Sequence, residues 1–242
     1  MIEEAENLGL ISPGDTLLET SSGNTGIALA GMSLIKGYKM IVLLPKIASS
    51  ERLNILKRLG AVILLHNPEE GRANTLEYAK KLSNLNGWKM LNQYENQANV
   101  RAHNKTGEEI VNKLKDYKII PDFLILGIGT GGSITGISQV LKKEYPLIKV
   151  IGVIPQDRVE GLRGLDDFKP PILDLSLVDE IIKVKELDAK EGVNRLVKKY
   201  GVSVGISSGA VFFVAKQIAE KQEGKKIITL FPDGIDKYLS YI

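Results

Sequence analysis

Apolar runs and amphipathic segments alternate along most of the chain. The runs from Met40 to Leu44, from Phe123 to Leu126 and from Val150 to Ile154 hold no polar side chain. Such runs are typical of strands buried on both faces of a parallel sheet. The segments between them carry apolar residues at helical spacing, as from Glu51 to Leu59. This alternation predicts an α/β fold, with doubly wound, mostly parallel sheets and helices on both faces.

The same pattern gives approximate bounds for the elements. We expect strands at 16–19, 40–44, 61–65, 89–91, 123–126, 150–154, 178–184 and 227–231, with the run 61–65 as buried as the run 40–44. We expect helices at 1–9, 27–36, 51–59, 73–82, 101–114, 137–144, 189–200 and 210–221. Residues 155–176 interrupt this rhythm with three prolines and two glycines. A loop of this length inside a compact domain is usually functional or mobile.

A glycine-rich turn follows the expected strand at Phe123–Leu126. Five glycines fall between Gly127 and Gly136, and a helix is expected immediately afterwards. The sequence Gly129-Thr-Gly-Gly-Ser133, here called the glycine turn, offers backbone N–H groups, two hydroxyls and little side-chain bulk. A strand, a glycine turn and a helix N-terminus together form a common binding site for phosphate groups. We therefore expect a phosphate-bearing small cofactor at this turn.

Two other phosphate-binding patterns fit less well. Gly127, Gly129 and Gly132 match G-x-G-x-x-G, but the dinucleotide fingerprint normally opens the first βαβ unit and has an acidic residue about 20 positions further on. The nearest candidate acid, Asp157, falls in a loop after Pro155. No lysine follows the glycines, so the P-loop pattern of nucleotide hydrolases is excluded.

Two further polar turns contain the same kinds of residue. They are Thr20-Ser-Ser-Gly-Asn-Thr-Gly26, which opens a helix, and Gly205-Ile-Ser-Ser-Gly209, which opens another. We expect each of the three turns to follow a strand. They should then gather at the carboxyl edge of the sheet, where folds of this class bind ligands.

Composition narrows the class of protein. The chain has 242 residues, 43% hydrophobic and 25% charged, with a net charge of +3 spread along the sequence. This bias is too weak to indicate binding to nucleic acid or a membrane. Cysteine is absent, and the two histidines, His66 and His103, are far apart in sequence. Thiolate chemistry is therefore excluded, no metal site is expected, and a cytoplasmic protein is the natural reading.

The three turns, in this order and spacing, resemble the cysteine synthases, which are pyridoxal-phosphate enzymes of the tryptophan-synthase β fold (fold type II). The resemblance runs nearly end to end. It includes Met1-Ile-Glu-Glu-Ala-Glu6, Leu91-Asn-Gln-Tyr-Glu-Asn96 and Phe231-Pro-Asp-Gly234. It implies pyridoxal 5'-phosphate as the cofactor. It also implies two domains, with residues 1–100 belonging to a smaller substrate-loop domain and residues 101–242 to a larger cofactor domain.

The resemblance also implies a role for each matching position. The cofactor-binding residues would be Asn24 at the pyridine 3-hydroxyl, Gly129, Thr130, Gly131, Gly132 and Ser133 at the phosphate, and Ser207 at the pyridine nitrogen. The substrate-binding residues would be Ser21, Ser22, Asn24, Thr25, Gln93 and Arg163. Ser207 has an alternative role as the N-cap of the following helix, and Ser208 could serve as that cap instead.

The implied reaction is a β-replacement that makes L-cysteine. The leaving group of O-acetylserine or O-phosphoserine departs and sulfide adds in its place. Ser21 and Ser133 stand where the family usually has threonine, and Arg163 resembles the cysteine synthase B branch and its phosphoserine-using relatives. The partners are then an amino-acid substrate and a sulfide donor, and relatives of this kind are commonly homodimers.

One expected residue is missing from the matching pattern. The lysine that forms the Schiff base in the family lies a few residues before the position of Met1, so we expect an N-terminal segment to be absent and this chain alone to be inactive. Lys46 is the nearest substitute by topology. The rival interpretations are a related fold II enzyme, such as a cystathionine β-synthase or a serine/threonine dehydratase, and a non-catalytic pseudoenzyme that binds cofactor or a partner protein.

Overall fold

The chain folds into two compact units, each with its own parallel sheet. The structure, a computed structural model, describes residues 1–21, 23–46, 49–67, 71–166 and 168–240. Unit 1 comprises residues 1–96 and 237–240, and unit 2 comprises residues 97–236. The alternation of strand and helix and the α/β fold class are confirmed.

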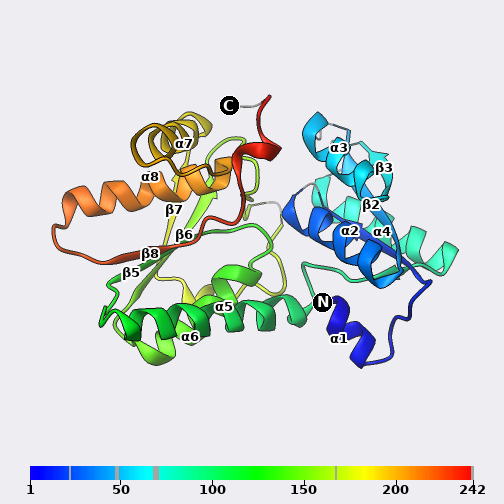
Figure 1. Ribbon diagram of the computed structural model, residues 1–242, viewed down its shortest axis with the longest axis horizontal. Coiled ribbons are helices and arrows are strands. Elements are labelled where there is room, and N and C mark those ends of the chain that lie inside the picture. Colours follow the sequence, from blue (N-terminus) through cyan, green and yellow to red (C-terminus); the bar gives the residue numbers. More distant parts are fainter. Residues whose placement is uncertain (22, 47–48, 68–70, 167, 241–242) are drawn as a thin grey trace. The chain divides into compact units, whose positions relative to one another are not determined.

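The bounds of the elements follow the sequence pattern closely (Figure 1). In unit 1 they are α1 (Ile2–Asn7), β1 (Thr16–Thr20), α2 (Asn24–Lys36), β2 (Lys39–Pro45), α3 (Ser50–Arg58), β3 (Val62–His66), α4 (Gly71–Asn86) and β4 (Lys89–Met90). In unit 2 they are α5 (Gln97–Asp116), β5 (Phe123–Gly127), α6 (Gly132–Glu144), β6 (Lys149–Pro155), η2 (Leu175–Leu177), β7 (Glu180–Val184), α7 (Glu186–Tyr200), α8 (Ile206–Lys221) and β8 (Ile227–Thr229). The short helix η3 (Ile235–Lys237) follows.

The sheet of unit 1 has the strand order β3-β2-β1-β4, and all its neighbouring strands run parallel. Because side chains alternate across a strand, β1 and β2 send Leu17 and Val42 to one face and Leu18 and Ile41 to the other. The first face packs with α2 and α3, and the second packs with α4. Burying a side chain of this size contributes about 1.5–3 kcal/mol, so these strands anchor the unit.

The expectation that residues 61–65 form a buried strand is wrong in part. The strand β3 exists, but Val62 is 57% exposed and Leu65 is 51% exposed. β3 lies at the edge of the sheet, where only one neighbour covers it. An apolar run therefore predicted the strand correctly but not its position in the sheet.

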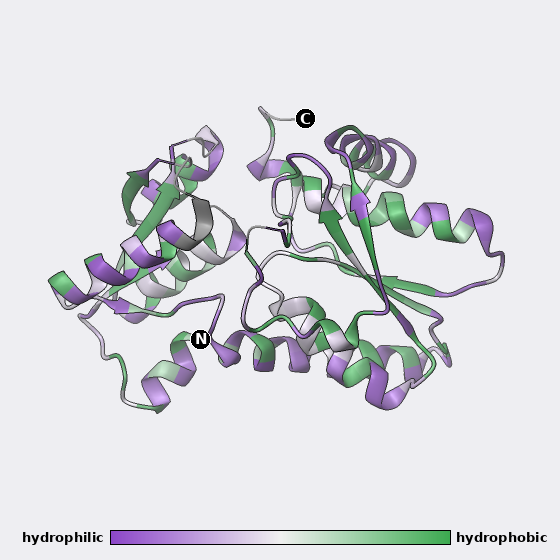
Figure 2. Ribbon diagram, turned by 180° about the vertical axis from the view of Figure 1, so that it is seen from behind, coloured by the Kyte–Doolittle hydropathy of each residue, from purple (hydrophilic) through white to green (hydrophobic). Residues whose placement is uncertain are grey.

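The sheet of unit 2 has the strand order β7-β6-β5-β8 and is also entirely parallel. Helices α5 and α6 cover one face, and α7 and α8 cover the other (Figure 1). Leu124 and Leu126 of β5 pack against Ile134, Ile137 and Leu141 of α6. The strands of this sheet are mostly green in the hydropathy view of Figure 2, while the helices carry purple, hydrophilic stretches.

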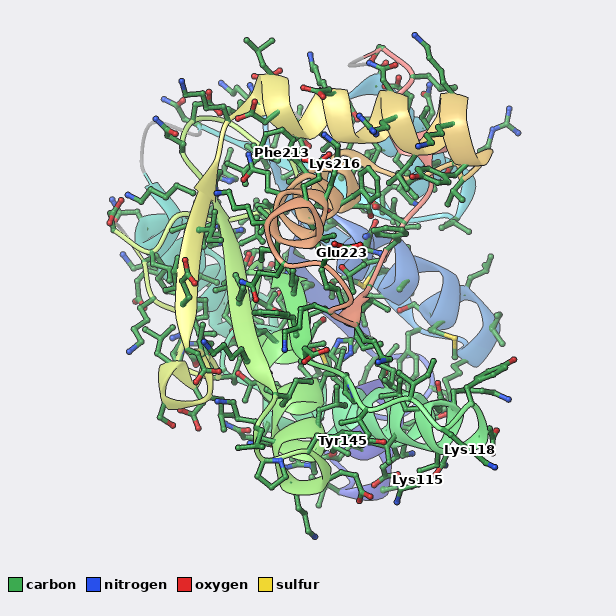
Figure 3. The ribbon with its side chains drawn as sticks, turned by 90° about the vertical axis from the view of Figure 1, so that its left-hand side faces the viewer. Lys115, Lys118, Tyr145, Phe213, Lys216 and Glu223 are labelled. Atoms are coloured by element: carbon green, nitrogen blue, oxygen red, sulfur yellow. The ribbon has the colours of Figure 1, made fainter. Side chains whose placement is uncertain are left out.

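An ion pair lies between the C-terminal ends of α5 and α6. The Lys115 ammonium lies 2.7 Å from the Glu144 carboxylate, which joins the ends of α5 and α6, and this hydrogen bond raises the pKa of Lys115. Figure 3 shows Lys115 near Tyr145 at that end of unit 2, with Phe213 and Lys216 on α8 at the other side of the sheet. These charges lie at the surface and contribute little to stability.

The third polar turn does not follow a strand, contrary to expectation. Helix α7 ends at Tyr200, and α8 begins at Ile206 after an extended link without strand pairing. The backbone N–H of Gly205 donates to the carbonyl of Asp233 at 2.9 Å, which ties this link to the segment after β8. The polar turn correctly indicated the start of a helix, but the link before it is held by a contact that is distant in sequence.

Candidate functional site

The glycine turn joins β5 to α6 in unit 2. Helix α6 has Gly131 as its N-cap residue, which makes no side-chain cap bond. The N-terminus of a helix carries a partial positive charge and unpaired N–H groups, both of which favour an anion. The turn therefore has the chemistry expected of a phosphate site.

The side chains of the turn add hydroxyl groups and no opposing charge. Thr130 and Ser133 are both half-buried, and the Gly132 N–H lies 3.3 Å from Thr130 Oγ1. No acidic residue occurs between Gly129 and Ser133. These residues fit a phosphate group, since they supply hydrogen-bond donors and carry no negative charge that would repel the anion.

Glycine is required at position 131 by its backbone conformation and by its packing. The backbone has φ +88° there, a region that other residues rarely adopt. A Cβ atom at this position would lie 2.6 Å from Cβ of Leu173. A side chain at 131 would therefore collide with the 155–176 loop, and the collision does not depend on a bound phosphate.

The loop 155–176 lies against the glycine turn and the start of α6. The backbone N–H of Arg163 donates to the carbonyl of Ile128 at 2.8 Å, and the N–H of Asp174 donates to Thr135 Oγ1 at 3.0 Å. These bonds hold the first and last parts of the loop. The Arg163 side chain is half-buried, and its backbone is bound to the residue just before the turn.

Ser207 lies in the first turn of α8. It is 6% exposed, and the residue at the N-cap position is Gly205, with no side-chain cap bond. The alternative roles of Ser207 and Ser208 as caps are therefore wrong. Helix α8 packs near the carboxyl end of β5, since a Cβ on Gly127 would lie 3.5 Å from Val211. Ser207 is thus one helical turn from Val211, which approaches Gly127 at the end of β5.

The turn between β1 and α2 gathers polar groups in unit 1. The hydroxyl oxygen of Ser21 accepts hydrogen bonds from the N–H of Gly26 at 3.0 Å and of Gly23 at 3.3 Å. The side-chain Oδ1 of Asn24 is buried without a hydrogen-bond partner among the described residues. A buried acceptor without a partner suits a ligand that brings its own donor. Thr25 follows in the first turn of α2, and Ser22 lies outside the described residues.

Gln93 is bound to the strand that leads into this turn. Its side-chain Nε2 donates to the carbonyl of Thr20 at 2.7 Å, and its backbone N–H donates to Glu19 Oε2 at 3.1 Å. Glu19 is fully buried, and the sequence analysis did not identify it. Its signal would have been an acidic residue inside an otherwise apolar strand.

The predicted residues thus form two groups, one in each unit. Ser21, Asn24, Thr25 and Gln93 belong to unit 1, and Gly129–Ser133, Arg163 and Ser207 belong to unit 2. Lys46, the possible substitute lysine, is exposed just after β2.

Two residues of α5 contact the glycine turn and were missed in the sequence. Asn99 Nδ2 donates to Thr130 Oγ1 at 3.2 Å, and His103 Nε2 lies 3.0 Å from Ser133 Oγ. Burial lowers the pKa of His103, which favours its neutral form. One signal was present in the sequence, since His103 is one of only two histidines, although histidines far apart in sequence indicate no site by themselves.

Other kinds of site find no support in the described part of the chain. Within it, no helix is both long enough and apolar enough to cross a membrane, and no group of three potential metal ligands occurs. Asp157, the weak dinucleotide candidate, accepts a hydrogen bond from the N–H of Glu186 at 2.7 Å. It therefore holds the first N–H group of α7.

Comparison with known proteins identifies relatives across nearly the whole chain. Residues 1–233 match the family model "Pyridoxal-phosphate dependent enzyme". A cysteine synthase of Staphylococcus aureus is 38% identical over 254 aligned positions, which cover 99% of this chain and 81% of the relative. The structure of an O-ureido-L-serine synthase superposes with a TM-score of 0.92 at 31% identity, covering 99% of this chain and 79% of the other. A hydrogen sulfide-producing enzyme from Fusobacterium nucleatum superposes with a TM-score of 0.91 at 34% identity, covering 98% and 84%.

Proposed function

Because the chain belongs to the pyridoxal-phosphate-dependent enzyme family, we propose that it serves a β-replacement that makes L-cysteine from an activated serine and sulfide. The activated serine is O-acetylserine or O-phosphoserine. The observation that carries the proposal is the glycine turn at the start of α6, with its two hydroxyls and a glycine at the N-cap position. The 38% identity to a cysteine synthase supports the reaction assigned to it.

The glycine turn is assigned to the cofactor phosphate. Thr130 and Ser133 would donate their hydroxyl hydrogens, and the first N–H groups of α6 would donate along the helix axis. Pyridoxal 5'-phosphate, when bound, supplies the electron sink that lets a β-substituent leave an amino acid. The turn itself takes no part in bond breaking, and its task is to fix the position of the cofactor.

Ser207 is assigned to the ring nitrogen of the cofactor. A neutral hydroxyl there leaves the nitrogen unprotonated, which weakens the electron sink and favours β-elimination over transamination. The position of Ser207 in the first turn of α8, 6% exposed and without a capping role, supports the assignment.

The residues of unit 1 are assigned to the substrate and to the cofactor hydroxyl. Asn24 would accept from the cofactor 3-hydroxyl, since its Oδ1 is buried without a partner among the described residues. Ser21, Ser22, Thr25 and the start of α2 would hold the substrate carboxylate, with help from Gln93. The N-terminus of α2, whose N-cap Gly23 makes no side-chain cap bond, favours a carboxylate as it would favour a phosphate.

On this proposal unit 1 is the smaller substrate-loop domain and unit 2 is the cofactor domain, with a domain boundary near residue 100. The resemblance to cysteine synthases supports a homodimer that acts in the cytoplasm. The place of the Schiff-base lysine before Met1 stays a prediction.

The test is an assay of the product of the complete reading frame, loaded with pyridoxal 5'-phosphate. We expect cysteine to form from O-acetylserine or O-phosphoserine with sulfide, and no cystathionine to form from serine with homocysteine. Cystathionine formation, or deamination of serine or threonine, would assign the protein to a rival fold II activity. Cofactor binding without turnover of any of these substrates would favour the pseudoenzyme interpretation.

A second candidate is the release of hydrogen sulfide from cysteine. The similarity to a hydrogen sulfide-producing enzyme favours it, and β-elimination from cysteine uses the same residues as β-replacement. The same preparation given cysteine alone decides between them. Sulfide release faster than cysteine synthesis would make elimination the main reaction.

A further inference from the structure

The hydrogen bonds around Thr130 fix the direction of its hydroxyl hydrogen. Asn99 Nδ2 donates to Thr130 Oγ1 at 3.2 Å, and the Gly132 N–H donates to the same oxygen at 3.3 Å. A hydroxyl has two acceptor lone pairs and one hydrogen. With both lone pairs occupied, Thr130 has only its hydrogen left to offer, so it must act as a donor to any further partner.

The direction of the Ser133 hydroxyl hydrogen follows from the tautomer of His103. His103 Nε2 lies 3.0 Å from Ser133 Oγ, and His103 Nδ1 is buried without a partner among the described residues. A hydrogen on Nδ1 would be a buried donor without an acceptor. Buried donors without a partner are rarer and more costly than buried acceptors without one. The hydrogen therefore belongs on Nε2, which donates to Ser133 Oγ. The Ser133 hydroxyl hydrogen is then directed elsewhere.

The contacts with Thr130 and Ser133 both come from one face of helix α5. Asn99 and His103 are four residues apart, so they lie one above the other on the helix. Gly132 makes the approach possible, because a Cβ atom at that position would collide with the Asn99 amide. Glycine is thus required at position 132 because Asn99, which orients Thr130, packs against it.

We propose that Asn99 and His103 are positioning residues that direct the hydroxyl hydrogens of Thr130 and Ser133 away from α5, so that both are available as donors to a phosphate ester. The oxygens of an ionised phosphate group accept hydrogen bonds, so hydroxyl donors at the turn favour its binding. The inference rests on the proposed function, because it assumes that the turn holds the cofactor phosphate. It adds how α5 sets the chemistry of that site.

Double-mutant cycles on the whole chain test the inference, with inorganic phosphate and pyridoxal 5'-phosphate as separate probes in titration calorimetry. We expect Asn99→Ala to weaken binding of both probes about tenfold or more, as for a lost hydrogen bond to a charged group. In a Thr130→Val background the same change should have almost no further effect, because no hydroxyl remains to orient. Asn112→Ala, at an exposed position of the same helix, is the matched control and should leave binding unchanged.

The second cycle pairs His103 with Ser133. His103→Leu should weaken binding to a similar extent, whereas His103→Gln should largely retain it, because the glutamine amide also offers a donor at that distance. Thermal unfolding without ligand separates misfolded variants from folded ones. If His103→Leu does not fold, the affinity of His103→Gln and the Asn99 cycle still test the inference.

The results separate the inference from the proposed function. The inference would be overturned if the Asn99 and His103 substitutions weakened binding equally whether or not the Thr130 and Ser133 hydroxyls were present. Unchanged affinity in Asn99→Ala and His103→Leu would also overturn it, even if the cofactor binds. Binding of inorganic phosphate with the expected couplings, but no binding of pyridoxal 5'-phosphate, would overturn the cofactor assignment and leave the inference standing. If neither probe binds the unaltered chain, both fail.

Discussion

At the scale of single residues, Gly131 shows how packing and backbone conformation act together. Its φ of +88° and the nearness of Leu173 both exclude a larger residue. Strain in this region of backbone angles costs about 1–3 kcal/mol, and overpacking costs a similar amount. The turn is therefore held in its conformation before any ligand arrives.

The first prediction follows for the stability of the chain. Gly131→Val should lower the free energy of unfolding by about 3 kcal/mol, measured by urea denaturation. Gly164→Ala is the matched control in the same unit, because a Cβ there meets nothing within 4 Å. An unchanged midpoint for Gly131→Val would show that the contact with Leu173 is not formed in solution.

The second prediction concerns His103. Burial lowers its pKa from the ordinary value of 6.5, so as the pH falls the unfolded chain takes up this proton before the folded chain does. Stability should therefore decrease as the pH falls through about 6.5 and below. His103→Gln should remove this part of the decrease, seen by comparing urea midpoints at about pH 7.5 and about pH 5.5. The same pH dependence of stability in both proteins would show that His103 does not cause this part of the decrease.

At the scale of elements, a short tail is bound to helix α3. Both oxygens of Glu51 accept hydrogen bonds from Ser240, at 2.6 Å from its N–H and at 2.9 Å from its hydroxyl. The Arg52 guanidinium lies over the Tyr238 ring at 4.8 Å. These contacts place residues 237–240 in unit 1, although the sequence boundary assigned them to the second domain.

The third prediction tests this attachment by pH. The hydrogen bond from the Ser240 side chain, with backbone hydrogen bonds, lowers the pKa of Glu51 from 4.5 to about 2. The contribution of Glu51 is therefore complete above pH 4.5 and is lost as the pH falls towards 2. Glu51→Gln and Ser240→Ala should each reduce the acid sensitivity of unfolding in that range. A slope as steep as in the unaltered chain would show that the tail is not bound there.

The fourth prediction concerns the loop that carries Arg163. The loop is tied to the glycine turn through the bond from the Arg163 N–H to Ile128, and a half-buried guanidinium can bind a phosphate with two parallel hydrogen bonds. In the product of the complete reading frame, Arg163→Ala should lower kcat/KM for O-phosphoserine about tenfold more than for O-acetylserine. Lys169→Ala, which removes an exposed charge from the same loop, should affect both donors equally. Equal losses for Arg163→Ala would leave Arg163 without a role in donor choice.

The elements show which features a sequence can predict. Strand and helix periodicity gave every strand and nearly every helix, because each depends on residues that are neighbours in the chain. The edge position of β3 and the absence of a strand before α8 could not be predicted, because contacts distant in sequence decide each of them. The contacts of Asn99 and His103 with the turn, 31 and 30 positions away, escaped for the same reason, although the turn itself was clear from its glycines.

At the scale of the whole molecule, the two units carry complementary groups of polar residues. Unit 2 offers a donor-lined anion site, and unit 1 offers a helix N-terminus with a buried acceptor, Asn24 Oδ1. Under the proposed function, Thr130 would serve the cofactor phosphate, Asn24 the phenolic hydroxyl and Ser207 the ring nitrogen.

The fifth prediction concerns covalent attachment of the cofactor to this chain of 242 residues. A lysine is activated for Schiff-base formation by desolvation or by a neighbouring cation, whereas Lys46 is exposed. Borohydride treatment with pyridoxal 5'-phosphate should therefore leave no stoichiometric adduct on Lys46, as judged by peptide mass mapping. A stoichiometric adduct at that residue would make Lys46 the attachment site.

The most direct test of the central claim is a crystal structure of this chain with pyridoxal 5'-phosphate. The claim predicts the phosphate group within hydrogen-bond distance of the hydroxyls of Thr130 and Ser133, at the N-terminus of α6. It also predicts that Asn99 and His103 keep their contacts with those hydroxyls. A cofactor bound elsewhere, or a phosphate that contacts neither hydroxyl, would contradict the assignment of the glycine turn and the function built on it.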